Sequence, residues 1–212
     1  MTKTLTAQDV FKFSPVMPVV TLEDARHAGP LARALLAGGL KTLEIALRTP
    51  ASLDAIRVAA AEAPDLVVGA GTVLSAADLD AAIAAGARYA LSPGATPSLL
   101  QAAKGAPIPL APGVGTASEV MLALEHGYTH CKFFPAETMG GPAALKQIGA
   151  PLPAVRFCPT GGIGPDAVAK YLALPNVICV GGSWVAPADK IAAGDWGAIE
   201  ALARQAASYA RP

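Results

Sequence analysis

Short apolar runs alternate with longer amphipathic stretches along almost the whole chain. Each amphipathic stretch is rich in alanine, ends at a glycine and is soon followed by an apolar run, as in AGGLKTLEIAL, AAGARYALSP and EHGYTHCKFFP. A glycine after a helix-period pattern marks a helix end, and a short apolar run bounded by turn residues favours a buried strand. The pattern therefore predicts alternating helices and strands. The predicted strands are residues 16–20, 42–47, 66–70, 89–92, 108–112, 130–134, 155–160 and 177–181.

These strands recur at intervals of roughly 20–26 residues, the length of a compact βα unit. Eight such units in 212 residues predict an α/β fold, a (β/α)8 TIM barrel. We expect a single compact domain over residues 1–212 with a short N-terminal helical segment, closed by a helix with Trp196 and Ile199 on its apolar face. An open, doubly wound sheet is the alternative, but no G-x-G-x-x-G follows the first strand.

Polar residues mark the starts of several predicted helices. Thr21–Asp24, Ser75–Asp78 and Thr116–Glu119 fit a loose capping-box pattern. Thr49 and Thr96 each precede a proline, which is typical of an N-cap followed by proline at the first helical position. These residues are therefore assigned to structure.

The overall charge and hydropathy exclude several classes of protein. Lys+Arg and Asp+Glu both number 16, so the net charge of +0 gives no reason to expect nucleic acid or an anionic membrane surface. Mean hydropathy is high, at +0.44. However, the longest charge-free run, residues 171–188, contains two prolines and two glycines and would make a poor spanning helix. The first twenty residues lack the apolar core of a signal peptide, so we expect a soluble cytoplasmic protein.

Cysteine and histidine offer no redox or metal motif. Cys131, Cys158 and Cys179 each lie in an apolar run and are expected to be small buried side chains. His126 and His130 have a metal-ligand spacing, but a glycine falls between them and the glutamate of HExxH is missing. No metal site is expected.

A lysine in the middle of a predicted strand is the first candidate for chemistry. Alternate residues of a barrel strand face the interior, so Lys132 of HCKFF is expected to point inward. In TLEIALR, the same period places Leu43 and Ile45 under the helices and leaves Glu44 and Arg48 for the interior. A structural ion pair of lysine and glutamate is one interpretation. Polar groups near the carboxyl ends of barrel strands are usually functional, and burial beside another cation favours a neutral, nucleophilic amine. Lys132 is therefore predicted to form a Schiff base.

Two glycine-rich turns follow the last two predicted strands. They are TGGIGP, residues 160–165, and GGSW, residues 181–184. Barrels commonly bind phosphate at these two loops through backbone N–H groups, although turn chemistry alone also explains paired glycines. Neither turn contains lysine or arginine, so a phosphate would rely on backbone donors and the Ser183 hydroxyl. Thr72, at the end of the third strand, is either a turn residue or a hydroxyl for a substrate carboxylate beside Arg48.

Read together, these motifs resemble the 2-keto-3-deoxy-6-phosphogluconate aldolase family of class I aldolases. The motifs TLEIALRT, VVGAGTVL, LSPG, KFFPAE, RFCPTGGI and GGSW occur in the family's order from about Val16 to the last helix. The resemblance implies a (β/α)8 barrel, a homotrimer, no metal or organic cofactor and a phosphorylated keto-acid substrate. It implies cleavage of 2-dehydro-3-deoxy-6-phosphogluconate to pyruvate and glyceraldehyde 3-phosphate, and also of 4-hydroxy-2-oxoglutarate to pyruvate and glyoxylate.

The resemblance also implies a role for each matching residue. Lys132 is the imine-forming lysine and Glu44 the general acid and base. Arg48 and Thr72 hold the carboxylate of the pyruvyl group. The remaining positions are the pocket-lining residues Pro93 and Phe134, the substrate contact Thr160, and the phosphate-binding residues Gly161, Gly162, Gly182 and Ser183.

Two positions depart from the family pattern, and three other functions compete. Ala46 and Gly115 stand where many members have threonine and serine, which puts pocket hydration and substrate tolerance in doubt.

A 2-dehydro-3-deoxy-6-phosphogalactonate aldolase shares the lysine, glutamate and arginine, but Thr160 favours the gluconate enzyme. A phosphosugar isomerase or epimerase would use Glu44 as base and Lys132 only as a charge. A non-catalytic phosphate-sensing barrel is the third alternative. The predicted polar interior argues against it, because a barrel without catalysis would be more stable with an apolar interior.

Overall fold

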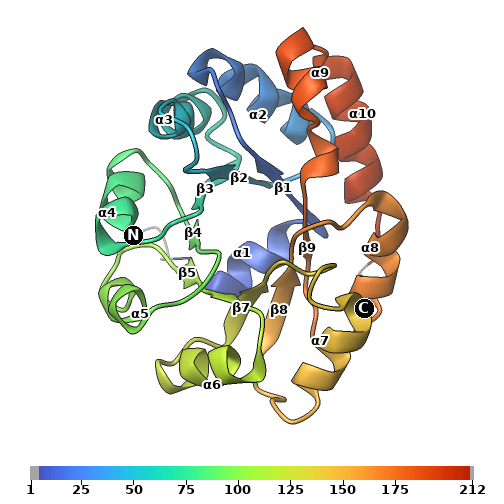
Figure 1. The fold of residues 1–212 in the computed structure, drawn as a ribbon. Coiled ribbons are helices and arrows are strands. Elements are labelled where there is room, and N and C mark those ends of the chain that lie inside the picture. The colour runs from blue at the N-terminus through green and yellow to red at the C-terminus, as the bar shows by residue number, and fades with distance from the viewer. Residues whose placement is uncertain (1–4, 211–212) are drawn as a thin grey trace.

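The computed structural model describes residues 5–210 and shows parallel strands surrounded by helices (Figure 1). Every predicted strand is present, although the predicted strand 177–181 begins three residues later. A further short strand, β6, was not predicted. The strands are β1 (Val16–Val20), β2 (Thr42–Ala46), β3 (Val67–Gly71), β4 (Ala90–Leu91), β5 (Leu110–Ala111), β6 (Gly113–Val114), β7 (His130–Phe133), β8 (Arg156–Pro159) and β9 (Val180–Gly182).

The strands form two parallel sheets. One has the order β5-β4-β3-β2-β1-β9 and the other has the order β6-β7-β8. Isolated parallel bridges, Phe157 to Val177 and Thr160 to Gly181, connect the segments of β8 and β9. The observed architecture is thus an α/β fold with a curled parallel sheet, which confirms the predicted fold class at this coarser level.

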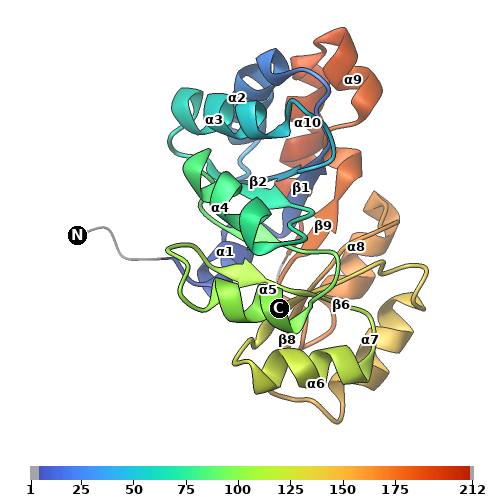
Figure 2. The ribbon, with the colours of Figure 1, turned by 60° about the vertical axis from the view of Figure 1, so that its left-hand side comes forward.

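Helices cover the outside of the sheets, and Figure 2 shows α2, α3 and α10 together beside β1, β2 and β9. Trp196 and Ile199 belong to α10, so the predicted closing helix is confirmed. The helices are α1 (Ala7–Phe13), α2 (Ala28–Ala37), α3 (Ser52–Glu62), α4 (Ala76–Ala84), α5 (Pro97–Ala103), α6 (Ala117–Glu125), α7 (Gly141–Gly149), α8 (Pro165–Leu172), α9 (Ala188–Ala193) and α10 (Trp196–Ala207), with 3-10 turns η1 (Ala25–His27) and η2 (Ser183–Val185).

The predicted helix caps are partly correct. Thr116 forms a capping box with Glu119, and Ser75 and Thr96 are N-caps. The prediction at Thr49 is wrong, because α3 begins only at Ser52 and the Thr49 hydroxyl instead donates to the carbonyl of Leu22 at 2.5 Å. At 21–24 the cap is Asp24, whose carboxylate accepts from the backbone of η1.

Two apolar clusters lie on the two sides of the strands. The larger fills the space between strands and helices and contains Leu43 and Ile45. The smaller lies inside the curl, where Val10 and Phe11 of α1 pack with Tyr89 and other interior side chains. In Figure 1, α1 accordingly crosses the middle of the ring of strands. The predicted period of two along β2 is confirmed, and α1 covers one end of the interior.

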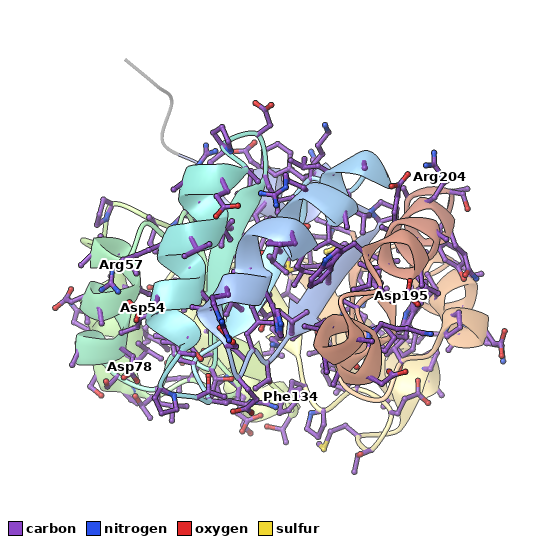
Figure 3. The ribbon with its side chains drawn as sticks, turned by 90° about the horizontal axis from the view of Figure 1, so that it is seen from above. Asp54, Arg57, Asp78, Phe134, Asp195 and Arg204 are labelled. Carbon is purple, nitrogen blue, oxygen red and sulfur yellow. The ribbon has the colours of Figure 1, made fainter. Side chains whose placement is uncertain are left out.

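The helix surfaces carry exposed ion pairs. Asp54 and Arg57 pair one turn apart on α3 (Figure 3), and Glu200 pairs with Arg204 on α10. Exposed pairs of this kind contribute little to stability. Among the helices of residues 5–210, none combines the length and the hydropathy needed to cross a membrane.

Candidate active site

Lys132 and Glu44 form a buried ion pair inside the curled sheet. They are 88 residues apart in sequence, and Lys132 Nζ donates to Glu44 Oε1 at 2.7 Å. Lys132 is 5% and Glu44 1% exposed. β7 and β2 bring them together because both side chains point into the interior, as their period of two predicted. The half-buried ring of Phe134 completes this group, with its centre 5.5 Å from the lysine nitrogen.

Glycine on the neighbouring strand makes room for the carboxylate. Gly71 of β3 pairs in register with Ala46 of β2. A Cβ at Gly71 would lie 2.1 Å from Glu44 Oε1, well inside van der Waals contact. Gly71 was not predicted as a site residue, although its place in the motif GAGTV was a usable signal.

Two polar oxygens in this interior have no hydrogen-bond partner among the described residues. They are Oε2 of Glu44 and the hydroxyl of Tyr89. Burial, with the neighbouring charge of Glu44 second, raises the pKa of Tyr89 well above its usual value. Buried polar groups normally find a partner. A free carboxylate oxygen beside an amine is therefore available to a substrate hydroxyl or a water.

Arg48 and Thr72 meet at the carboxyl ends of β2 and β3. Arg48 Nε donates to Thr72 Oγ1 at 3.2 Å. Thr72 has a φ of 61°, a left-handed conformation that is uncommon for a β-branched residue and stores strain. Arg48 is exposed at this edge, so it lies nearer the entrance than the buried lysine. The structure thus places these two residues side by side, and their binding of a substrate carboxylate stays a prediction.

A cavity of about 570 Å³ joins Arg48 to both glycine-rich turns. Its lining includes Gly162, Ser183 and, between β8 and α8, Ile163 and Gly164. We call residues 160–164 the glycine loop. Gly161 and Gly162 have φ values of 109° and 78°, so both conformations favour glycine. The cavity is large enough for a small-molecule ligand.

The other predicted site residues lie around these two groups. Thr160 is buried, and a Cβ at Gly181 would lie 2.2 Å from its hydroxyl. Pro93 is half-buried next to Gly113, whose backbone pairs with Lys132. Gly182 ends β9, directly before Ser183 in η2. The structure thus places Lys132, Glu44 and Phe134 together, and groups Arg48 with the glycine-rich turns along a separate cavity.

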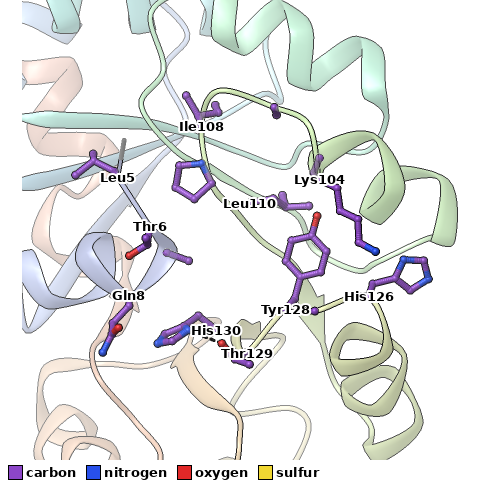
Figure 4. A pocket seen from close by; sticks show the side chains of 15 residues that line it. Leu5, Thr6, Gln8, Lys104, Ile108, Leu110, His126, Tyr128, Thr129 and His130 are labelled. Atoms are coloured by element: carbon purple, nitrogen blue, oxygen red, sulfur yellow. Dashed lines mark hydrogen bonds between the residues drawn. The ribbon is translucent and has the colours of Figure 1, made fainter. Parts of the chain in front are cut away.

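Another cavity, of about 500 Å³, contains none of the predicted site residues. Figure 4 shows it between the start of α1, the segment before β5 and the turn between α6 and β7. His126 and His130 line it, and within residues 5–210 no three metal-ligating side chains are grouped to hold an ion. Cys131, Cys158 and Cys179 are buried, as predicted, and none of them forms a disulfide.

The lysine–carboxylate pair indicates the kind of chemistry this interior supports. An amine that passes its proton to a neighbouring carboxylate has a free electron pair with which to attack a ketone. The same carboxylate then serves as acid or base for the later proton transfers. Imine formation followed by carbon–carbon cleavage is the chemistry of Schiff-base aldolases, which are lyases.

Comparison with known proteins leads to the same class. The family model for KDPG and KHG aldolase matches residues 7–202. The 2-dehydro-3-deoxy-phosphogluconate aldolase of Pseudoalteromonas atlantica is 52% identical over 97% of this chain and 96% of that protein. The KHG/KDPG aldolase of Escherichia coli (strain K12) is 49% identical over 97% of this chain and 96% of that protein.

A solved structure agrees in fold as well as in sequence. It is the KDPG aldolase of Legionella pneumophila with pyruvate captured at low pH as a covalent carbinolamine intermediate. Its TM-score with this chain is 0.93 at 46% identity, covering 95% of this chain and 98% of that one. The chain belongs to the KDPG and KHG aldolase family.

Proposed function

We propose that this protein cleaves 2-dehydro-3-deoxy-6-phosphogluconate to pyruvate and glyceraldehyde 3-phosphate by a Schiff-base mechanism. The buried contact of 2.7 Å between Lys132 and Glu44 carries this proposal, because it supplies a nucleophile and its proton acceptor together. The related chains named 2-dehydro-3-deoxy-phosphogluconate aldolase support the choice of substrate.

Imine formation begins with the ion pair. Lys132 passes a proton to Glu44, and the free electron pair of Nζ attacks the C2 ketone to give a carbinolamine. The carbinolamine oxygen takes up a proton and leaves as water, so that Nζ and C2 are joined in a protonated imine. No metal or organic cofactor takes part in these steps.

Cleavage then uses the imine as an electron sink. Glu44 accepts the proton of the C4 hydroxyl, directly or through a water, as the C3–C4 bond breaks. The electrons of that bond move to C3 and the imine nitrogen to form an enamine, and glyceraldehyde 3-phosphate leaves. Glu44 returns a proton to C3, and water hydrolyses the imine to pyruvate and free Lys132.

The substrate extends from the Lys132–Glu44 pair towards the separate cavity that Arg48 lines with the glycine-rich turns. Arg48 and Thr72 bind the pyruvyl carboxylate, since their hydrogen bond already places a cation and a hydroxyl together. Pro93 and Phe134 line the pyruvyl end, and Thr160 contacts the middle of the chain. The phosphate lies on Gly161, Gly162, Gly182 and Ser183, where backbone N–H groups approach closely.

We propose 4-hydroxy-2-oxoglutarate as a second substrate, because its pyruvyl half is identical. The Escherichia coli relative named KHG/KDPG aldolase supports this. The alternative phosphorylated substrate is the C4 epimer, 2-dehydro-3-deoxy-6-phosphogalactonate. Relatives at 45–52% identity are named 2-dehydro-3-deoxy-phosphogluconate aldolase, which favours the phosphogluconate compound. Initial rates on the three compounds distinguish these possibilities.

Four structural and cellular features stay part of the proposal. They are an eight-stranded (β/α)8 barrel, a single domain over residues 1–212 (of which 1–4 and 211–212 lie outside the described residues), a homotrimer and a cytoplasmic location. The two bridges between the segments of β8 and β9 support closure of the barrel. Three buried cysteines that form no disulfide suit a reducing compartment. Light scattering tests the trimer and cell fractionation the location.

Covalent trapping tests the mechanism most directly. The protein is incubated with pyruvate and sodium borohydride, and intact mass and peptide maps are compared with those of a Lys132→Arg variant. A single reduced pyruvyl adduct on Lys132, absent from the variant, is expected. An adduct on another lysine, or none on folded protein, would exclude the proposed nucleophile and favour an isomerase that uses Glu44 alone.

A further inference from the structure

The turn after β7 lies directly against the glycine loop. Ala136 N donates to Thr160 O at 2.8 Å, and Glu137 N donates to Gly161 O at 3.0 Å. The pairing of β7 with β8 thus continues beyond both strand ends into the loop. Because each bond fixes a backbone group of residues 160–161, the position of the loop depends on the turn.

Close packing reinforces these backbone bonds. A Cβ at Gly161 would lie 3.1 Å from Pro135 Cα, and one at Gly162 would lie 3.0 Å from Glu137 Cβ. Both distances are shorter than ordinary van der Waals contacts. The glycine loop therefore rests on the turn without space for a side chain between them.

One side-chain bond connects this turn to the helix that follows the glycine loop. Tyr171 on α8 is fully buried, and its hydroxyl donates to Glu137 Oε1 at 2.6 Å. Burial raises the pKa of Tyr171, and the bond to Glu137 raises it further, so the hydroxyl keeps its proton to donate. Short bonds from a hydroxyl to a carboxylate are among the stronger hydrogen bonds in proteins.

These contacts connect the turn after β7 both to the start of the glycine loop and to the helix that follows it. Glu137 fixes the loop's first half through its backbone and, through its side chain, holds the helix into which the loop runs. We infer that Glu137 and Tyr171 are positioning residues that set the geometry of the glycine loop and so determine the preference for phosphorylated substrates. This inference rests on the proposed function, in which the loop binds the substrate phosphate.

The test compares a phosphorylated substrate with one that has no phosphate. Tyr171→Phe removes only the hydroxyl that donates, and Glu137→Leu replaces the exposed carboxylate by a group of similar size that cannot accept the bond. For 2-dehydro-3-deoxy-6-phosphogluconate we expect KM to rise about 3- to 10-fold in each variant, with kcat within about twofold, as loss of one such hydrogen bond predicts. Borohydride trapping with pyruvate should proceed at the wild-type rate, because pyruvate does not reach the loop.

Tyr128→Phe is the matched control. The hydroxyl of Tyr128 also makes one hydrogen bond, donating to Leu100 O at 2.8 Å. Tyr128 lies in the turn between α6 and β7 and is not among the residues that contact the glycine loop. This variant should keep the wild-type KM. Thermal unfolding of all variants checks that each is folded.

Each other result overturns the inference. An unchanged KM in Tyr171→Phe and Glu137→Leu would show that the loop keeps its geometry without this bond. Equal losses in cleavage and in pyruvate trapping would show a general structural role. If wild-type protein forms no pyruvate adduct, the proposed function itself fails, and that result is distinct from either of the others.

Discussion

Gly71 lies against Glu44 so closely that a methyl group on its Cα would sit 2.1 Å from Oε1. The absence of a side chain on β3 therefore fixes where the carboxylate of β2 can be, and with it the contact to Lys132. Glu44 is almost fully buried, so it has little space in which to adjust. The proposed catalytic geometry thus depends on a residue that has no side-chain chemistry of its own.

Gly71→Ala is expected to displace Glu44 and lower kcat by on the order of 100-fold, the usual effect of moving a catalytic group by about 1 Å. Steady-state cleavage assays measure this. Gly94→Ala is the control, because a Cβ there meets no atom within 4 Å. Wild-type kcat in Gly71→Ala would mean that Glu44 has more freedom than its burial indicates.

Breaking the buried ion pair from one side should destabilise the protein. In Lys132→Met, the carboxylate of Glu44 loses its partner inside the interior, and about 3–5 kcal/mol of unfolding free energy is the typical cost of such a loss. Adding Glu44→Gln removes the stranded charge and should recover part of that stability. Urea unfolding at neutral pH measures both. A double variant less stable than Lys132→Met would contradict this account.

Much of this site could be predicted from local sequence because strands impose a simple rule. The period of two placed Glu44 and Lys132 on the inner side of their strands, and parallel pairing brought the strand ends to one edge. The glycine-rich turns marked the strand ends, so Gly162 and Ser183 were found in the same way. They line one cavity with Arg48 because parallel pairing brings the carboxyl ends of their strands to the same edge.

Contacts between distant segments could not be predicted in this way. The role of Gly71 depends on its register with β2, and the Tyr171–Glu137 bond joins residues 34 apart whose types are unremarkable in sequence. Thr49 failed as a helix cap because its hydroxyl finds a tertiary partner, the carbonyl of Leu22. Each of these depends on packing, which overrides local preference.

His130 should make stability depend on pH. Burial, and then the positive charges of Arg156 and Lys12, lower its pKa in the folded protein below the usual 6.5. The unfolded chain therefore binds more protons, so the stability from neutral His130 is complete above pH 6.5 and is lost as the pH falls through the lowered pKa. Urea unfolding across this range should show a smaller pH slope in His130→Gln. An unchanged slope would assign the pH dependence to other groups.

Substitution of Thr72 by asparagine should change the stability of the protein and its binding of pyruvate in opposite directions. Its φ of 61° is strained for threonine but acceptable for asparagine, so Thr72→Asn should raise the unfolding free energy by about 1 kcal/mol. The variant loses the hydroxyl that accepts from Arg48 Nε, so the pyruvate concentration needed for half-maximal borohydride trapping should rise severalfold. Thr72→Ser keeps the hydroxyl and is expected to retain wild-type trapping. If Thr72→Asn binds pyruvate as well as Thr72→Ser, the hydroxyl has no part in holding the carboxylate, and the left-handed conformation serves only the turn after β3.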